Sequence, residues 1–149
     1  MEIFVKRFEE LTLNELYDIL QLRVAVFVVE QHCIAMELDG RDQAAVHVWL
    51  AENGKVMACA RIMDRGVESE HVSIGRVVTA VHRAGLGSRV MQASIRAAKE
   101  YFHAGALYLE AQEYAVPFYA RQGFRPVSDT FILDGIPHVK MLRPADEEA

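Results

Sequence analysis

The chain has 149 residues, of which 52% are hydrophobic and 25% charged, and its net charge is -5 at pH 7. A chain of this length can form one domain that buries about two-thirds of the surface its unfolded form exposes. Its apolar runs end well short of the roughly 20 residues that a membrane span needs. The negative charge argues against a nucleic-acid-binding surface. We therefore expect a single domain over residues 1–149, with neither a nucleic acid nor a membrane as partner.

The N-terminus bears on location and on the first strand. Residues 1–10, MEIFVKRFEE, place charges where a secretory signal would need an unbroken apolar stretch. We interpret this segment as a strand and expect a cytoplasmic protein, with a frayed tail over residues 144–149.

Metal-site spacings are absent from the sequence, both for its cysteines, Cys33 and Cys59, and for its histidines. We expect free thiols and no metal.

Residues 11–16, LTLNEL, have the form of a helix start. Thr12 stands as the N-cap and Glu15 closes a capping box three residues later. Apolar residues follow at roughly helical spacing, namely Leu13, Leu16, Leu20 and Phe27. The pattern predicts a helix that continues to about Phe27.

A hairpin is predicted next. The apolar runs 45–51 and 56–62 are joined by Glu52-Asn53-Gly54-Lys55. Asn-Gly is a strong hairpin signal because both residues tolerate positive φ. We therefore expect an antiparallel pair of strands.

The second half of the chain alternates strands and helices. The patterns predict strands at 71–79, 106–111, 131–133 and 138–142, a helix over 86–101, and a short helix over 116–122 that Gly123 stops. This order is typical of a mixed α/β fold with one central sheet.

The stretch 76–91, RVVTAVHRAGLGSRVM, passes from a strand through two glycines into a helix. A helix N-terminus has unpaired N–H groups and about half a positive charge, so it can bind an anion. Gly85 and Gly87 would let a diphosphate approach the backbone, and Arg83 would add a charged contact. Alternatively, Gly85 makes only a tight turn. The spacing fits neither a P-loop nor the dinucleotide fingerprint.

Residues 116–124, VPFYARQGF, come about thirty residues after the glycine turn. The two motifs together resemble the GNAT superfamily of acyl-CoA-dependent N-acyltransferases, and within it the ElaA-type members. Further segments that look like that group are Leu22-Arg23, 26–31, Glu37, Asp39-Gly40, 73–78, 109–112 and 134–138. The resemblance covers nearly the whole chain and implies the GNAT fold, a mixed, mostly antiparallel sheet flanked by helices.

The resemblance also implies that acetyl-CoA is the acyl donor. Its diphosphate would bind main-chain amides of residues 83–88, and its pantetheine would pair with the strand that ends at Val77 and Val78, whose N–H groups could polarise the thioester. His82 stands where the family has Arg or Gln, which bears on affinity and pH sensitivity. The implied cofactor-binding residues are Val77, Val78, His82, Arg83, Ala84, Gly85, Leu86, Gly87, Ser88 and Gln112.

Attack on a thioester needs a neutral amine, and deprotonating an amine of pKa about 10.4 at pH 7 costs roughly 4.6 kcal/mol. Glu110 and Glu30 are the candidate general bases. Each is equally well interpreted as a solvated or ion-paired carboxylate. By resemblance, Tyr119 protonates the departing thiolate, and the alternative is an aromatic core residue with a polar tip.

Acidic residues after the first helix could attract a cationic amine. They are Glu30, Glu37, Asp39 and Asp42, and the residues expected to line the same cleft are His47, Arg61 and His138. A charged surface loop is the alternative. We take Glu37, Asp39 and His138 as the substrate-binding candidates.

These inferences together predict an N-acetyltransferase that acts as a monomer or homodimer. It would move an acetyl group from acetyl-CoA to a primary amine of a small molecule or peptide, by direct attack in a ternary complex. The alternative function is a non-catalytic acyl-CoA-binding or regulatory module.

Overall fold

The computed structural model describes residues 1–33, 35–82 and 85–146. Its strands are β1 (Glu2–Arg7), β2 (Val46–Glu52), β3 (Lys55–Met63), β4 (Val72–Thr79), β5 (Leu107–Gln112), β6 (Arg125–Pro126), β7 (Phe131–Leu133) and β8 (Ile136–Arg143). Its α-helices are α1 (Leu13–Arg23), α2 (Leu86–Phe102) and α3 (Val116–Arg121), and a π-helix, Val24–Glu30, continues α1.

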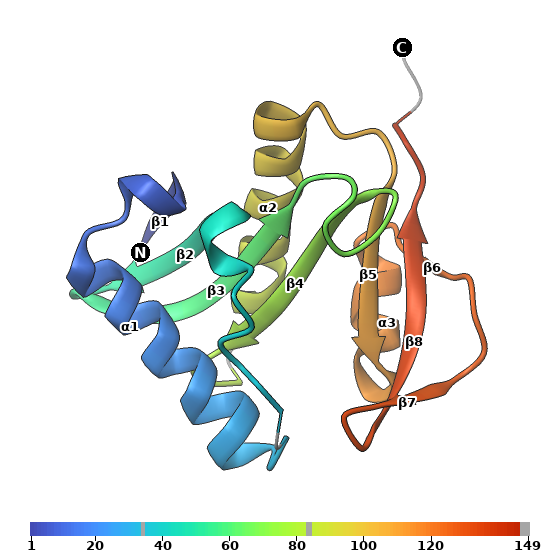
Figure 1. Ribbon diagram of the computed structural model, residues 1–149, viewed down its shortest axis with the longest axis horizontal. Coiled ribbons are helices and arrows are strands. Elements are labelled where there is room, and N and C mark those ends of the chain that lie inside the picture. The colour runs from blue at the N-terminus through green and yellow to red at the C-terminus, as the bar shows by residue number, and fades with distance from the viewer. Residues whose placement is uncertain (34, 83–84, 147–149) are drawn as a thin grey trace.

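The strands form one sheet in the order β1-β2-β3-β4-β5-β8-β6, with β7 also paired to β8. Every pairing is antiparallel except that of β4 with β5. The predicted mixed, mostly antiparallel sheet is therefore confirmed. The parallel pair joins only Val72 to Leu107 and Ser73 to Tyr108, and beyond these residues the two strands diverge (Figure 1).

Helices cover both faces of the sheet. On one face α2 packs against β2, β3 and β4, and its buried side chains include Val90 and Ala98. On the other face α1 and the π-helix enclose a smaller apolar cluster that contains Ile19, Trp49 and Cys59.

Both cysteines are free, as expected. Burial raises the pKa of Cys59 to about 12, so its thiol is inert.

The first helix begins as predicted. The Glu15 N–H donates to Thr12 Oγ1 at 3.1 Å, and Glu15 Oε1 accepts from the Thr12 N–H at 2.9 Å. The prediction that Leu13 belongs to the apolar face of this helix is wrong, because Leu13 is 87% exposed. The buried face runs through Ile19, Arg23 and Val26, and at about 100° per residue Leu13 lies roughly 120° from Ile19 around the helix.

Two hairpins have tight two-residue turns. Asn53 and Gly54 connect β2 to β3 with φ of 52° and 77°, and Asp134 and Gly135 connect β7 to β8 with φ of 51° and 77°. Positive φ at both positions is the type I′ turn that suits the twist of a hairpin. The predicted β2–β3 pair is confirmed.

The two-residue strand β6 was not predicted, because it is too short to carry a periodic pattern.

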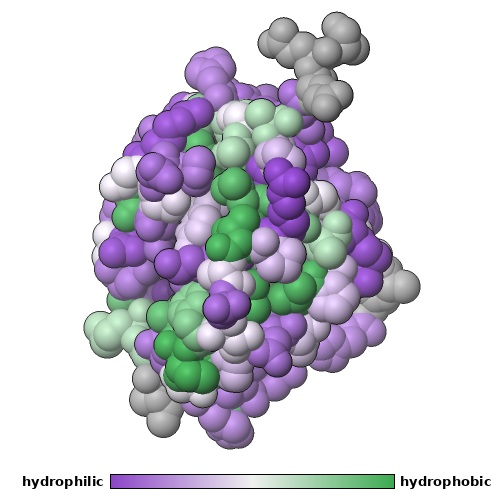
Figure 2. All heavy atoms as spheres, turned by 90° about the vertical axis from the view of Figure 1, so that its right-hand side faces the viewer, coloured by the Kyte–Doolittle hydropathy of each residue, from purple (hydrophilic) through white to green (hydrophobic). Residues whose placement is uncertain are grey.

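The surface beside β8 is largely polar. Figure 2 shows mostly hydrophilic residues on this side, with small apolar areas between them. Val127 and Ile132, from the segment between β6 and β8, are 52% and 67% exposed. None of the helices in the described part of the chain has the length and hydropathy that a membrane crossing requires.

The described part of the tail makes ion pairs, and the expected fraying of residues 144–149 stays a prediction. Asp146 forms ion pairs with Lys99 of α2 and, at 3.1 Å between Oδ1 and Nη2, with Arg143 of β8. These contacts hold the described part of the tail against the body of the protein. Residues 147–149 lie outside the described residues.

Candidate functional site

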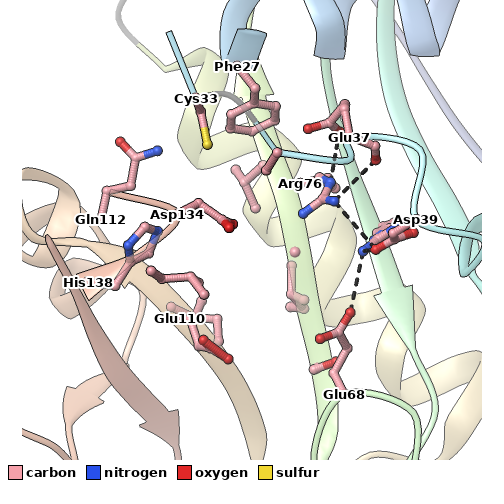
Figure 3. A pocket seen from close by; sticks show the side chains of 18 of the residues that line it. Phe27, Cys33, Glu37, Asp39, Glu68, Arg76, Glu110, Gln112, Asp134 and His138 are labelled. Carbon is pink, nitrogen blue, oxygen red and sulfur yellow. Dashed lines mark hydrogen bonds and ion pairs between the residues drawn. The ribbon is translucent and has the colours of Figure 1, made fainter. Parts of the chain in front are cut away.

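A cavity of about 520 Å³ opens where β4 and β5 diverge. One wall consists of β4, the end of β3 and the loop 33–41, and the other consists of β5, the start of β8 and α3. Figure 3 shows the two walls facing each other across the cavity. The volume lies within the range of roughly 300–1,000 Å³ that is usual for small-molecule sites.

The alternation of β5 builds one wall. Leu107, Leu109 and Ala111 are buried in the core, and Tyr108, Glu110 and Gln112 line the cavity, where Leu109 also contributes to the lining. Successive side chains of a strand point to opposite faces, so the sequence LYLEAQ determines this arrangement. Burial and the neighbouring Glu110 carboxylate raise the pKa of Tyr108 to about 12. Its neutral phenol can therefore donate to Glu110.

A β-bulge shapes the opposite wall. The pairing of β3 with β4 shifts between Cys59–Val78 and Arg61–Gly75, which leaves Arg76 and Val77 opposite one residue. Arg76 has φ of 51°, in the left-handed region that side chains other than glycine rarely adopt. Three contacts hold its guanidinium. They are an ion pair of Nε with Glu37 Oε2 at 2.8 Å, a hydrogen bond from Nη2 to the Glu37 carbonyl at 3.1 Å and an ion pair of Nη2 with Asp39 Oδ2 at 3.4 Å.

Three arginines pair with the predicted acidic segment. Arg23 and Arg61 are 1% and 3% exposed. Their ion pairs are Arg23 Nε–Glu37 Oε2 at 2.8 Å, Arg23 Nη1–Asp42 Oδ1 at 2.7 Å, Arg61 Nη2–Asp39 Oδ2 at 2.6 Å and Arg61 Nη1–Asp42 Oδ1 at 3.1 Å. The hydrogen bond from Arg61 lowers the pKa of Asp39. Burial opposes ionisation of Asp42, yet the Arg23 guanidinium still lowers its pKa.

This network changes the expected picture of the acidic segment. Glu37 and Asp39 line the cavity, but arginines compensate their charges, and Asp42 is buried away from the cavity. His47 does not line the cavity, contrary to expectation. It is 1% exposed, its Nε2 contacts the Asp42 carbonyl at 2.9 Å, and burial lowers its pKa. Binding of an amine by Glu37 and Asp39 stays a prediction.

Glu30 and Glu110 are not brought together. Glu30 is exposed at the end of the π-helix and borders a second hollow, which Asp18, Lys55 and Ala80 also line. Glu110 lines the main cavity with Tyr119 and His138. Of the two candidate bases, Glu110 alone shares a cavity with the candidate acid.

One ring nitrogen of His138 forms a hydrogen bond with the backbone. Its Nδ1 lies 2.7 Å from the Ile136 carbonyl oxygen. Since a carbonyl only accepts, Nδ1 carries the proton of this hydrogen bond. The side chain is 9% exposed and lines the cavity.

Two glutamines join the walls. Gln112 Nε2 of β5 donates to Gln31 Oε1 at 2.9 Å, and Gln31 Nε2 donates to Tyr114 Oη at 3.4 Å. Gln31 follows the π-helix, so this bridge links segments more than 80 residues apart. Gln112 therefore lines the cavity and has a partner that the sequence did not indicate, and its role in cofactor binding stays a prediction.

Tyr119 of α3 lines the same cavity. Its half-buried ring packs edge-on against Phe118 and Phe124, with centroids 5.1 Å and 6.2 Å away. Burial raises the pKa of Tyr119, so its phenol keeps its proton and can donate it. Tyr119 therefore packs as an aromatic residue and can also act as a proton donor.

The predicted glycine turn lies at the start of α2. Gly85 is the N-cap and has φ of 87°, and His82 is exposed, whereas Arg83 and Ala84 lie outside the described residues. A Cβ on Gly87 would lie 3.1 Å from Phe118 Cζ. The missing side chain at Gly87 therefore makes room for α3, a role that the sequence did not reveal.

The other predicted cofactor residues divide between core and cavity. Ser88 Oγ accepts from Gln122 Nε2 at 3.2 Å, which ties α2 to the end of α3. Leu86 is buried in the main core and Val78 in the cluster under α1, whereas Val77 lines the cavity.

Gly85→Ala should lower the free energy of unfolding by about 1 to 2 kcal/mol. The left-handed conformation is strained for a residue with a Cβ, even though open space surrounds this position. Gly105→Ala is the control, because a Cβ there makes an ordinary 3.5 Å contact with Ala145. Urea denaturation of both variants measures the difference, and equal stabilities would contradict the strain.

Comparison with solved structures defines the class of protein. The structure of an acyl-CoA N-acyltransferase from Pseudomonas aeruginosa matches with a TM-score of 0.88 and 37% identity, over 96% of this chain and 99% of the other. The structure of Escherichia coli ElaA matches with a TM-score of 0.88 and 35% identity, over 95% and 98%. The fold is therefore that of the acyl-CoA N-acyltransferases.

Sequence comparison gives the family. The model of the acetyltransferase (GNAT) domain matches residues 15–143. Protein ElaA of Escherichia coli K12 is 37% identical over 138 residues, 90% of each chain, and a UPF0039 protein of Schizosaccharomyces pombe is 40% identical over 145 residues, 95% of each chain. The chain belongs to the GNAT acetyltransferase family, and the resemblance to its ElaA-type members is confirmed.

Proposed function

We propose that this protein transfers an acetyl group from acetyl-CoA to a primary amine of a small molecule or peptide, by direct attack in a ternary complex. The observation that carries the proposal is that Glu110 and Tyr119 line one cavity, beside the part of β4 that is not paired with β5. A carboxylate and a phenol at one site can serve as proton acceptor and proton donor. A cytoplasmic location and a monomeric or homodimeric state remain predictions.

The edge of β4 supports binding of the pantetheine arm. Among the described residues, β5 pairs with β4 only as far as Ser73, so Val77 and the end of the strand have no partner on that side. The extended amides of pantetheine can pair with such an edge as a further strand would. An N–H of β4 near Val77 or Val78 would then polarise the thioester carbonyl.

The start of α2 supports binding of the diphosphate. Its first turn contains no acidic residue, and Gly85 gives no side-chain cap to the N–H groups that begin the described helix. These groups, with the dipole of a 17-residue helix, favour an anion. We assign the diphosphate to residues 83–88, with His82 beside it, and the acyl end to Val77, Val78 and Gln112.

The proposed reaction proceeds in one addition and one elimination. The amine nitrogen loses its proton toward Glu110 and bonds to the thioester carbon, and the carbon–sulfur bond then breaks. The thiolate takes the proton of Tyr119, whose phenolate regains one from solvent, and Glu110 releases the amine proton to solvent. Tyr108 donates to Glu110 and so orients the base. Glu37, Asp39 and His138 are the proposed amine-binding residues on the two walls.

Acetyl-CoA at about 100 times its dissociation constant should stabilise the protein by about 2.7 kcal/mol. A thermal-shift titration at neutral pH measures this, with dephosphorylated pantetheine as a control that lacks the diphosphate. Release of free thiol after addition of an amine panel tests the reaction. Absence of a shift at millimolar acetyl-CoA would contradict the proposal, and binding without amine-dependent thiol release would indicate a non-catalytic module.

A further inference from the structure

The two walls of the cavity differ in charge. Five carboxylates and three guanidinium groups line it. On the β4 wall every guanidinium is paired, with N–O distances of 3.0 Å for Arg41–Glu68, 2.6 Å for Arg61–Asp39 and 2.8 Å for Arg76–Glu37. Glu110 and Asp134, on the opposite wall, form no ion pair with a Lys or Arg among the described residues; Lys140 lies opposite Glu110 in the β5–β8 register, with its Nζ over the Phe131 ring. The dashed lines of Figure 3 accordingly lie on one wall only. The cavity lining therefore contains two carboxylates that form no ion pair among the described residues.

The turn between β7 and β8 fixes Asp134. It is the first residue of the type I′ turn, with φ of 51°, and Gly135 follows with φ of 77°. In Figure 3 its carboxylate points into the cavity, between Cys33 and His138. Asp134 and Glu37 both raise the pKa of Cys33, after burial as the largest cause, so the field of Asp134 crosses the cavity.

A buried hydroxyl group independently indicates a ligand. Ser73 lies where β4 and β5 separate, opposite Tyr108 in register, and it lines the cavity. It is 4% exposed, and its Oγ has no hydrogen-bond partner among the described residues. Buried polar groups are almost always paired, so an unpaired one at a cavity floor fits a polar ligand atom.

We propose that the acceptor is a small diamine, whose reacting amine lies near Glu110 and whose second ammonium group binds Asp134. The inference deepens the proposed function and rests on it. A dication matches the two carboxylates that form no ion pair, and an ammonium hydrogen matches the unpaired acceptor of Ser73. A substrate carboxylate would instead meet like charge, and the ion-paired arginines of the β4 wall have carboxylate partners already.

Three amines of matched length test the proposal. They are 1,4-diaminobutane, 1-aminobutane and 4-aminobutanoate, each assayed for acetyl-CoA-dependent thiol release. We expect kcat/KM for the diamine to exceed that for the monoamine at least tenfold, with 4-aminobutanoate the poorest. Equal values for the diamine and the monoamine would overturn the diamine inference and leave acetyl transfer intact.

Asp134→Asn isolates the second contact. Asn is favoured at this position of a type I′ turn, so the variant keeps the hairpin while losing the charge. We expect KM for 1,4-diaminobutane to rise about fivefold or more, and KM for 1-aminobutane to change less than twofold. Asp129→Asn is the matched control, because Asp129 is exposed outside the cavity and carries the same charge.

Calorimetric titration of the same amines, with and without coenzyme A, separates the two proposals. Diamine binding that Asp134→Asn weakens supports the diamine site even if no acetyl transfer occurs. Transfer to 1-aminobutane with no preference for the diamine supports the reaction alone. A loss in Asp129→Asn equal to that in Asp134→Asn would also overturn the inference, since it would show only a net-charge effect.

Discussion

Tyr119→Phe should lower kcat by about 100-fold or more, and it should change the affinity for acetyl-CoA less than twofold. A thiolate leaves more readily when a proton donor is in reach, and burial keeps the Tyr119 phenol protonated. Phenylalanine retains the edge-on contacts with Phe118 and Phe124, so the packing of α3 should survive. The variant therefore removes the proton without removing the ring.

Tyr114→Phe is the matched control for this experiment. Tyr114 lines the same cavity, but it is 73% exposed and its hydroxyl accepts from Gln31. Steady-state kinetics and calorimetry with acetyl-CoA compare the two variants. Unchanged turnover in Tyr119→Phe would remove the assignment, and equal losses in both would show that neither phenol has a specific role as acid.

Arg23→Met should lower the free energy of unfolding by about 3 to 5 kcal/mol. Arg23 is 1% exposed and pairs with Glu37 and Asp42, so the variant removes one of the two cations that each of these carboxylates contacts in a buried region. Breaking a buried ion pair from one side costs more than the pair contributes, because the remaining charge is poorly solvated. The loop 37–42 and the β4 wall should become more mobile in this variant.

Arg96→Met on the exposed face of α2 is the control and should change the stability by less than about 0.5 kcal/mol. Urea denaturation across pH separates charge from packing. Arg23 helps to lower the native pKa of Asp42, so this stabilisation is present above the unfolded pKa and disappears as the pH falls below it. The gap between wild type and Arg23→Met should narrow below about pH 4. A gap that stays constant with pH would show that Arg23 acts only through packing.

Local patterns predicted much of the fold. The capping box of Thr12 and Glu15, the Asn53-Gly54 turn and the helix that starts after Gly85 all depend on neighbours along the chain. The alternation of Tyr108, Glu110 and Gln112 determined one wall of the cavity in the same way. Such features are legible in a sequence because hydrogen bonding and side-chain direction repeat over two to four residues.

Charge compensation, by contrast, depends on residues far apart in the chain. Arg23 meets Asp42, and Arg61 meets Asp39, only because α1, the loop 37–42 and β3 pack together. No periodic pattern indicates which acidic residues are paired, so the sequence could not show that Glu37 and Asp39 are compensated.

By itself, then, the sequence determined the family and most of the elements. The tertiary structure alone decided that Glu30 lies apart from Glu110, that Gly87 makes room for Phe118, and that Asp134 faces the β4 wall. The physical reason is that hydrogen bonds and periodicity act locally, whereas burial and ion pairing depend on which distant segments the fold brings into contact.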